Sequence, residues 1–181
     1  MYSQANETNN LTLLEKEFDL TEIINAEEVM SPSPFRRHQR IIINLSDIIS
    51  PYAKRNKIGR VYTSPLDVIF EDGANRLQPD LLFIRNDNTS IEQDWINGIP
   101  DMVCEVISQA SYYKDTVTKK NIYEKYKVPE YWIVIPELKT IEILTLEDNI
   151  FKPFSIAAIE GMVQSKVMKG LNINIKEVFE D

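Results

Sequence analysis

Apolar residues gather in short runs along most of the chain, and their spacing predicts a series of β-strands. The runs are rich in β-branched and aromatic residues and are bounded by Pro, Gly, Asn or Asp, as is typical of strands. Each run is shorter than an ordinary helix. The predicted strands are a pair within 18–30 that turns at Asn25-Ala26, then 59–63, 66–70, 79–85, 101–107, 131–135 and 140–146.

Two longer segments carry apolar residues three or four positions apart, which predicts amphipathic helices at 35–56 and at about 114–127. Pro51 lies inside the first helix and is expected to kink or interrupt it near Asp47. Helices and strands that alternate in this way predict an α/β (α+β) fold with mixed strand pairing. The apolar stripe of the first helix consists of Ile41, Ile42, Leu45, Ile48, Ile49 and Tyr52.

Composition narrows the class of protein. With 181 residues, of which 43% are hydrophobic, we expect a single domain over 1–181 with its core at about 15–180. No apolar run approaches the roughly 20 residues of a membrane span, and the polar start lacks the layout of a signal peptide, so we expect a cytoplasmic protein without a membrane partner. The single cysteine, Cys104, excludes an internal disulfide and a multi-cysteine zinc site.

Charge is segregated along the chain although the net charge is −8. Residues 1–30 carry seven acidic side chains and one basic one, whereas residues 31–60 carry seven basic side chains and one acidic one. One interpretation is a set of alternating solvated surfaces. The other is a pair of basic segments on either side of an acidic centre that attracts a metal ion. The overall negative charge means that any contact with nucleic acid must be local.

Two helical side chains are candidates for chemistry because they share a face with apolar residues. His38, the only histidine, lies on the apolar stripe of the first helix, where it is either a hydrogen-bonded packing residue or a functional group. Lys119 shares a face of the second helix with Asp115 and Tyr123. It forms either an ordinary i,i+4 ion pair with Asp115 or part of a site.

Two carboxylates lie in segments that otherwise predict buried strands. Asp80 opens the run Leu81-Leu82-Phe83-Ile84, and Glu105 lies in the middle of 101–107. A buried carboxylate needs a compensating partner, which can be a lysine or a divalent cation shared by both acids. Two acids and a lysine are the minimum set for metal-assisted phosphodiester hydrolysis.

Several blocks of the sequence resemble the restriction-endonuclease family of PD-(D/E)XK nuclease-like proteins, which is abundant in bacteria and especially in cyanobacteria. The blocks are 28–34 (EVMSPSP), 37–39 (RHQ), 78–81 (QPDL), 100–108 (PDMVCEVIS), 128–134 (VPEYWIV), 165–171 (SKVMKGL) and 177–179 (EVF). The resemblance spans about 15–180 and implies a restriction-endonuclease-like core, in which helices flank a mixed central β-sheet. It also implies a DNA endonuclease that depends on Mg²⁺ or Mn²⁺.

The resemblance also implies roles for individual residues. Asp80 matches the aspartate of the PD motif and Glu105 the second acid, but Ile107 stands where the motif has its lysine. The family's Asp-x-x-x-Lys-x-x-x-Tyr pattern supplies that lysine from the next helix and matches Asp115, Lys119 and Tyr123.

Further expectations follow from the same resemblance. A backbone carbonyl of Val106 or Ile107 is expected to complete the metal shell. Glu28 and His38 match an additional acid and an imidazole donor. Arg36, Arg37, Arg40 and Lys120 are expected to bind phosphates of duplex DNA, and two sites in a homodimer would cut the two strands.

Three functional hypotheses remain open at this point. The first is the metal-dependent DNA endonuclease that uses Asp80, Glu105 and Lys119. The second is a noncatalytic DNA-binding or protein-interaction subunit of the same fold, in which these residues form a structural ion-pair network. The third is an enzyme that acts on a phosphoester other than a polynucleotide or on another metal-dependent substrate.

Overall fold

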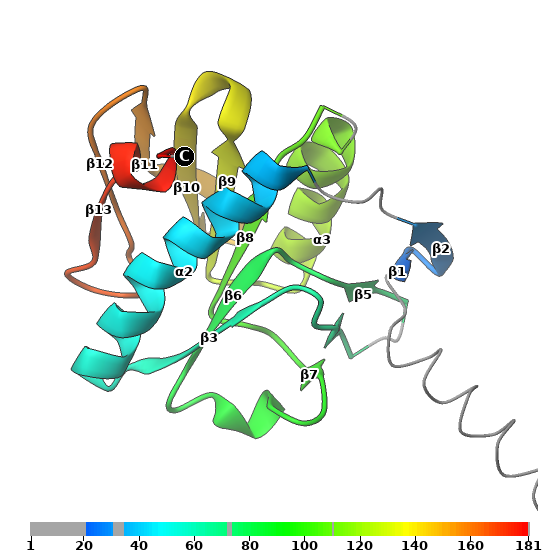
Figure 1. Ribbon diagram of the computed structural model, residues 1–181. Coiled ribbons are helices and arrows are strands. Elements are labelled where there is room, and N and C mark those ends of the chain that lie inside the picture. The colour runs from blue at the N-terminus through cyan, green and yellow to red at the C-terminus, as the bar shows by residue number, and fades with distance from the viewer. Residues whose placement is uncertain (1–20, 31–34, 72–73, 110, 181) are drawn as a thin grey trace, which may run out of the picture.

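A mixed six-stranded sheet forms the centre of the protein in the computed structural model, which describes residues 21–30, 35–71, 74–109 and 111–180 (Figure 1). The strand order is β11-β10-β9-β8-β6-β3. Strands β8 and β9 are parallel and the other neighbours are antiparallel, which confirms the predicted mixed pairing. The strands are β3 (Gly59–Thr63), β6 (Leu81–Arg85), β8 (Met102–Val106), β9 (Glu130–Ile135), β10 (Thr140–Glu147) and β11 (Ile150–Ala158).

The two faces of this sheet are buried under different helices because side chains alternate along each strand. Met102, Cys104 and Val106 of β8 belong to the apolar cluster that contains the buried residues of α2 (Arg36–Asn56). Val103 and Ile107 belong to the other cluster, which contains apolar residues of α3 (Lys120–Lys125). The predicted architecture of a sheet flanked by helices is therefore confirmed.

Helix α2 has the predicted apolar stripe but not the predicted interruption. Its residues Ile41, Ile42, Leu45 and Ile49 are buried, whereas the helix continues through Pro51 to Asn56. Pro51 removes the amide that would bond to the carbonyl of Asp47, and Asp47 is exposed, so water can satisfy that carbonyl. Burial of apolar side chains on both sides of Pro51 favours the continuous helix over the local preference of proline.

A second sheet lies beside the first and has the order β2-β1-β5-β4-β7. The predicted N-terminal hairpin is confirmed for its described part, while 18–20 lie outside the described residues. The strand predicted at 66–70 shortens to two residues in this sheet. The strands of this sheet are β1 (Thr21–Ile24), β2 (Glu27–Met30), β4 (Val68–Ile69), β5 (Arg76–Leu77) and β7 (Ile96–Asn97).

The remaining elements are short. Strands β12 (Met162–Gln164) and β13 (Asn172–Asn174) pair with each other, helix α4 is Ile175–Val178, and two 3₁₀ turns are Thr89–Ile91 and Pro136–Leu138.

The second predicted helix has a π-helical first part. Residues Lys114–Lys119 (η2) form this wider turn and α3 continues it as an ordinary helix. The hydroxyl of Tyr131 donates a hydrogen bond of 2.9 Å to the carbonyl of Asp115, which an α-helix would pair with the amide of Lys119. Insertion of a side chain into the helical hydrogen-bond ladder accounts for the wider turn.

Candidate active site

The register between β6 and β8 brings the two predicted acids together. Leu81 pairs with Cys104, so Asp80, one residue before β6, lies beside Glu105 at the same end of the sheet. The amide of Val106 donates a hydrogen bond of 2.7 Å to Oδ2 of Asp80 and fixes this carboxylate at the strand end. The prediction that the strands carrying Asp80 and Glu105 are neighbours is confirmed.

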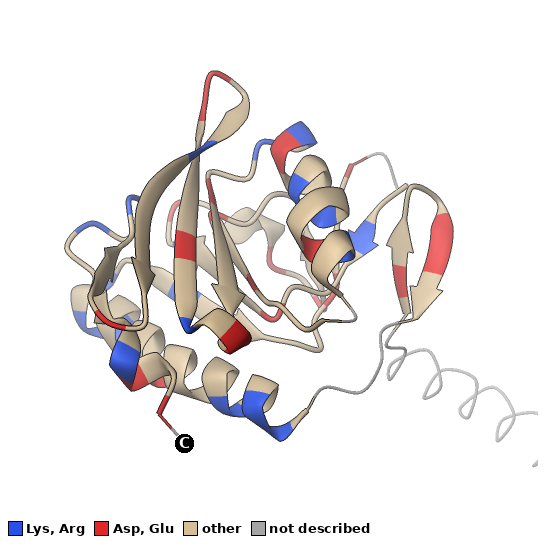
Figure 2. Cartoon of the chain, turned by 90° about the horizontal axis from the view of Figure 1, so that it is seen from above, with Lys and Arg blue, Asp and Glu red and all other residues tan. Residues whose placement is uncertain are grey.

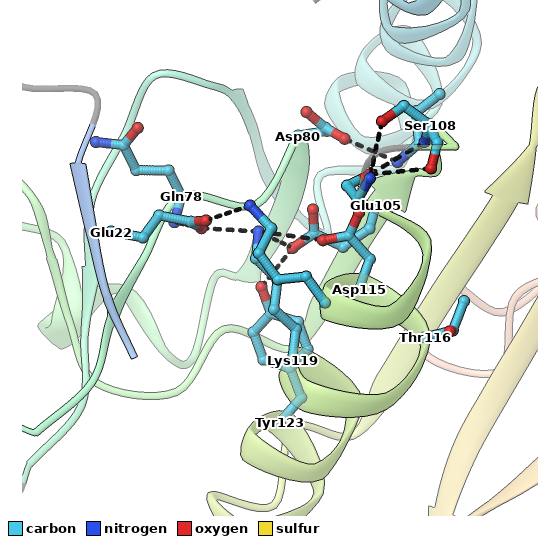
Figure 3. A network of polar contacts seen from close by, with 12 residues as sticks. Glu22, Gln78, Asp80, Glu105, Ser108, Asp115, Thr116, Lys119 and Tyr123 are labelled. Carbon is cyan, nitrogen blue, oxygen red and sulfur yellow. Dashed lines mark hydrogen bonds and ion pairs between the residues drawn. The ribbon is translucent and has the colours of Figure 1, made fainter. Parts of the chain in front are cut away.

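Lys119 points into the protein and is surrounded by carboxylates. Its side chain is only 3% exposed, and Nζ lies 2.7 Å from Oε1 of Glu22, 3.0 Å from Oε1 of Glu105 and 3.8 Å from Oδ1 of Asp115. The hydroxyl of Tyr123 donates to the same Oε1 of Glu105 over 2.7 Å. Figure 3 shows these side chains converging between the hairpin β1–β2 and the helix. The inward orientation that the helical periodicity predicts for Lys119 is therefore confirmed.

Burial and charge act in opposite directions on the pKa values of this cluster. Burial raises the pKa of Glu105 well above its ordinary value, although the charge of Lys119 opposes the rise. Burial also raises the pKa of Asp115. For Lys119 burial alone would lower the pKa, but the negative charges of Glu105, Glu22 and Asp115 raise it above its ordinary value. The ammonium therefore stays charged, and the surrounding acids exceed it in number.

Glu22 is the additional acid of this cluster, and the prediction of Glu28 for that position is wrong. Glu22 pairs with Val29 in the hairpin and Glu28 pairs with Ile23, so the two acids lie on opposite faces. Glu28 is exposed, whereas Glu22 is 2% exposed and contacts Lys119. The signal in the sequence was the acid inside Thr21-Glu22-Ile23-Ile24, the same pattern that identified Glu105.

Lys114 is a second residue that the sequence did not identify. Its Nζ lies 3.0 Å from Oε2 of Glu22. Burial would raise the pKa of Glu22, but Lys119 and Lys114 together bring it below its ordinary value. Glu22 is therefore the acid of the cluster that stays ionised most readily.

His38 lies at the edge of the site, where α2 approaches the end of β6. Its Nε2 is 3.2 Å from Oδ2 of Asp80, and Nδ1 is buried without a hydrogen-bond partner among the described residues. Burial alone would lower the pKa of His38, but the hydrogen bond and charge of Asp80 raise it above its ordinary value. The imidazole therefore contacts the candidate acid rather than serving only as a packing residue.

Comparison with known proteins identifies the family of the chain. A model of the Uma2 family, described as "Putative restriction endonuclease", matches residues 12–176. The chain belongs to the Uma2 family. A comparison with curated proteins gave no match.

The Uma2 chain also resembles a solved structure. A crystal structure titled as a "putative nuclease belonging to DUF820" from Anabaena variabilis ATCC 29413 superposes with a TM-score of 0.72 at 17% sequence identity, covering 88% of this chain and 89% of the other. The likeness shows a shared fold. No helix among the described residues of the Uma2 chain is long and apolar enough to cross a membrane.

The backbone near Glu105 decides which carbonyl of the Uma2 chain faces the acids. The amide of Ile107 donates to the carbonyl of Val134 on β9, away from Asp80, so Ile107 is not the expected ligand. Val106 has its amide on Asp80, and in an extended strand the carbonyl of a residue points to the same side as its amide. Val106 therefore replaces Ile107 as the candidate backbone ligand.

Carboxylate and carbonyl oxygens, the ligand type that Mg²⁺ and Mn²⁺ prefer, gather at this position. Both contacts of Asp80 use Oδ2, and Oδ1 takes part in neither. Among the described residues, no three His, Cys, Asp or Glu side chains are arranged to hold a metal ion. Asp80, Glu105 and the carbonyl of Val106 supply two carboxylates and one backbone oxygen, and Mg²⁺ commonly completes such a set with water and substrate phosphate.

The predicted phosphate-binding residues of the Uma2 chain lie outside this cluster. Arg36, Arg37 and Arg40 are exposed at the start of α2, and Arg37 donates a hydrogen bond of 2.6 Å to the carbonyl of Pro136. Lys120 is half-buried on α3. Figure 2 shows basic residues at both ends of α2 and along α3, while acidic residues mark the hairpin β1–β2.

Proposed function

We propose that this Uma2 chain is a divalent-metal-dependent DNA endonuclease that hydrolyses phosphodiester bonds. The observation that carries the proposal is the 3.0 Å contact between Lys119 and Glu105. Ile107 occupies the position where a nuclease of this type has its lysine. Lys119, on the following helix, places an ammonium beside Glu105 instead. The family description and the shared fold support a nuclease.

Each side chain has a defined part in this proposal. Asp80, Glu105 and the carbonyl of Val106 would hold Mg²⁺ or Mn²⁺, which when bound polarises a phosphate and acidifies water. Lys119 places a fixed positive charge beside Glu105, where it can orient the nucleophile or stabilise developing negative charge. Tyr123 holds Glu105 through its hydroxyl, and Asp115 limits the movement of Lys119.

The substrate in this proposal is duplex DNA. Arg36, Arg37, Arg40 and Lys120 would bind its phosphates, and such contacts weaken steeply with salt and carry little sequence preference. Cleavage of both strands would use two copies of the chain, one site for each strand. A cytoplasmic location gives access to such a substrate.

A second candidate function has its own supporting observation. Oε1 of Glu105 already accepts from both Lys119 and Tyr123, so these buried groups satisfy one another without a cation. A noncatalytic DNA-binding or protein-interaction subunit could retain such a network as structure.

The decisive experiment incubates supercoiled, relaxed and single-stranded DNA with the protein and Mg²⁺ or Mn²⁺. Asp80→Ala and Lys119→Ala are compared with the parent, and Asp148→Ala, in an exposed turn, is the matched control. Cleavage by the parent and the control but by neither site variant supports the endonuclease.

Each other outcome points to a different conclusion. Loss in Asp80→Ala alone retains the metal site and removes Lys119 from it. No cleavage and no metal binding by calorimetry support the noncatalytic subunit. Metal binding without cleavage of any DNA points to another phosphoester as substrate.

A further inference from the structure

We propose that Glu22 is a positioning residue that holds Lys119 and the turn bearing Asp80 in a fixed relation to each other. The inference rests on the proposed function for its catalytic consequence. Glu22 lies on β1 and is separated from Lys119 by 97 positions in the sequence. It is buried, and its carboxylate makes contacts with two different parts of the site.

One oxygen of Glu22 joins the two parts directly. Oε1 accepts a hydrogen bond of 2.9 Å from the amide of Gln78 and lies 2.7 Å from Nζ of Lys119. Gln78 is two residues before Asp80, and Pro79 between them is buried and has a restricted φ. The position of Gln78 is therefore transmitted to Asp80 through a stiff segment. Figure 3 shows Glu22 between Gln78 and the helix.

The other oxygen of Glu22 is held by Lys114, and the π-helical turn makes this contact compatible with that of Lys119. The two lysines are five residues apart, so an ordinary helix would direct them to different sides. Residues Lys114–Lys119 form the π-helical segment, whose hydrogen bonds run from i to i+5. This turn brings both ammonium groups to one carboxylate, where Nζ of Lys114 lies 3.0 Å from Oε2.

A consequence for catalysis follows from this geometry. Glu105 and Asp115 also attract Lys119, over 3.0 Å and 3.8 Å. Among the described residues, Glu22 contacts both this ammonium and the segment that precedes Asp80. Glu105 connects the ammonium to Asp80 by a different route, along β8 and through the amide of Val106. Without the charge of Glu22, Lys119 keeps Glu105 and Asp115 as partners but loses its link to Gln78 and the segment before Asp80.

The test compares Glu22→Gln with Glu28→Gln, since Glu28 lies on the opposite face of the same hairpin and is exposed. Two readouts need no enzymatic activity. The first is the rate of reductive methylation of Lys119 in the folded protein, followed by mass spectrometry. The second is the amide chemical shift of Val106, which donates to Asp80.

In Glu22→Gln we expect methylation of Lys119 to become about tenfold faster, the scale of one lost charged hydrogen bond, and the amide of Val106 to shift. Glu28→Gln should change neither. Glu22→Asp keeps the charge and should restore part of the protection; if Glu22→Gln does not fold, Glu22→Asp is compared with the parent and should show a smaller change of the same sign.

Catalysis provides the third readout and separates the two proposals. If the parent cleaves DNA, Glu22→Gln should lower kcat with little change in KM. An unchanged Lys119 rate together with an unchanged Val106 shift overturns the positioning role, whatever happens to activity. Changes in both readouts with a parent that cleaves no DNA retain the positioning role and remove the endonuclease.

Discussion

Replacement of Lys119 by methionine tests the buried cluster most directly. Met keeps a long apolar side chain but removes the ammonium that contacts Glu22, Glu105 and Asp115, all of which are buried. Loss of one partner of a buried ion pair costs about 3–5 kcal/mol, because the remaining charge is left uncompensated. A domain of ordinary stability has about 5–15 kcal/mol in total, so Lys119→Met should fold but be strongly destabilised.

The assay is urea unfolding followed by circular dichroism. With a urea dependence of about 2 kcal/mol per molar, the midpoint of Lys119→Met should fall by about 2 M at pH 8. The loss of stability in Lys119→Met should depend on pH. Burial already raises the pKa of Glu105 and Asp115, and without Lys119 it raises them further. Carboxyls with raised pKa values in the folded state stabilise it at low pH and lose that contribution as the pH rises. The urea midpoint of Lys119→Met should therefore approach that of the parent as the pH falls toward 5.

A double variant provides the control for this reasoning. Glu105→Gln together with Lys119→Met removes one of the charges that the loss of Lys119 leaves uncompensated, while the glutamine oxygen can still accept from Tyr123. The double variant should be more stable than Lys119→Met at pH 8. Equal destabilisation at pH 5 and pH 8, or a double variant no more stable than the single one, would refute the assignment of Lys119 as the charge partner of these acids.

Three further predictions use separate parts of the structure. Tyr123→Phe removes the 2.7 Å bond to Glu105 and should lower the free energy of unfolding by about 1.5–3 kcal/mol in urea titration; an unchanged midpoint would contradict that bond. Arg40→Gln should reduce the slope of log K against log salt by about 1 in a duplex-DNA binding titration, and an unchanged slope would remove Arg40 from the interface. Cys104 is buried and burial raises the pKa of its thiol, so iodoacetamide should modify it in urea but not in the native protein, as mass spectrometry can check.

Much of the fold follows from local patterns that the tertiary structure did not alter. The strands at 59–63 and 131–135 and the apolar stripe of α2 are found where apolar spacing predicted them. Pro51 was one exception, since burial of Ile49 and Ala53 on either side of it outweighs the local tendency of proline to end a helix. The strand predicted at 66–70 was another, because it shortens to Val68–Ile69.

The candidate site was predictable where periodicity alone decides which way a side chain points. Lys119 and Tyr123 share a helical face with apolar residues, and Asp80 and Glu105 begin or occupy buried strands. The choice between Glu22 and Glu28 could not be made in this way. Both lie in a short hairpin with acids on each face, and the face that is buried depends on which surface of the protein the hairpin meets.

The sequence by itself determined the elements, the mixed order of helix and strand, and the residue types of the acid–lysine cluster, because these depend on local spacing and on the cost of burying charge. The tertiary structure alone decided three further features: the contact of Glu22 with Lys119, the π-helical turn that adds Lys114, and the choice of Val106 over Ile107. The first two depend on contacts between residues far apart in the chain, and the third depends on which strand lies beside each backbone amide. Local periodicity specifies neither.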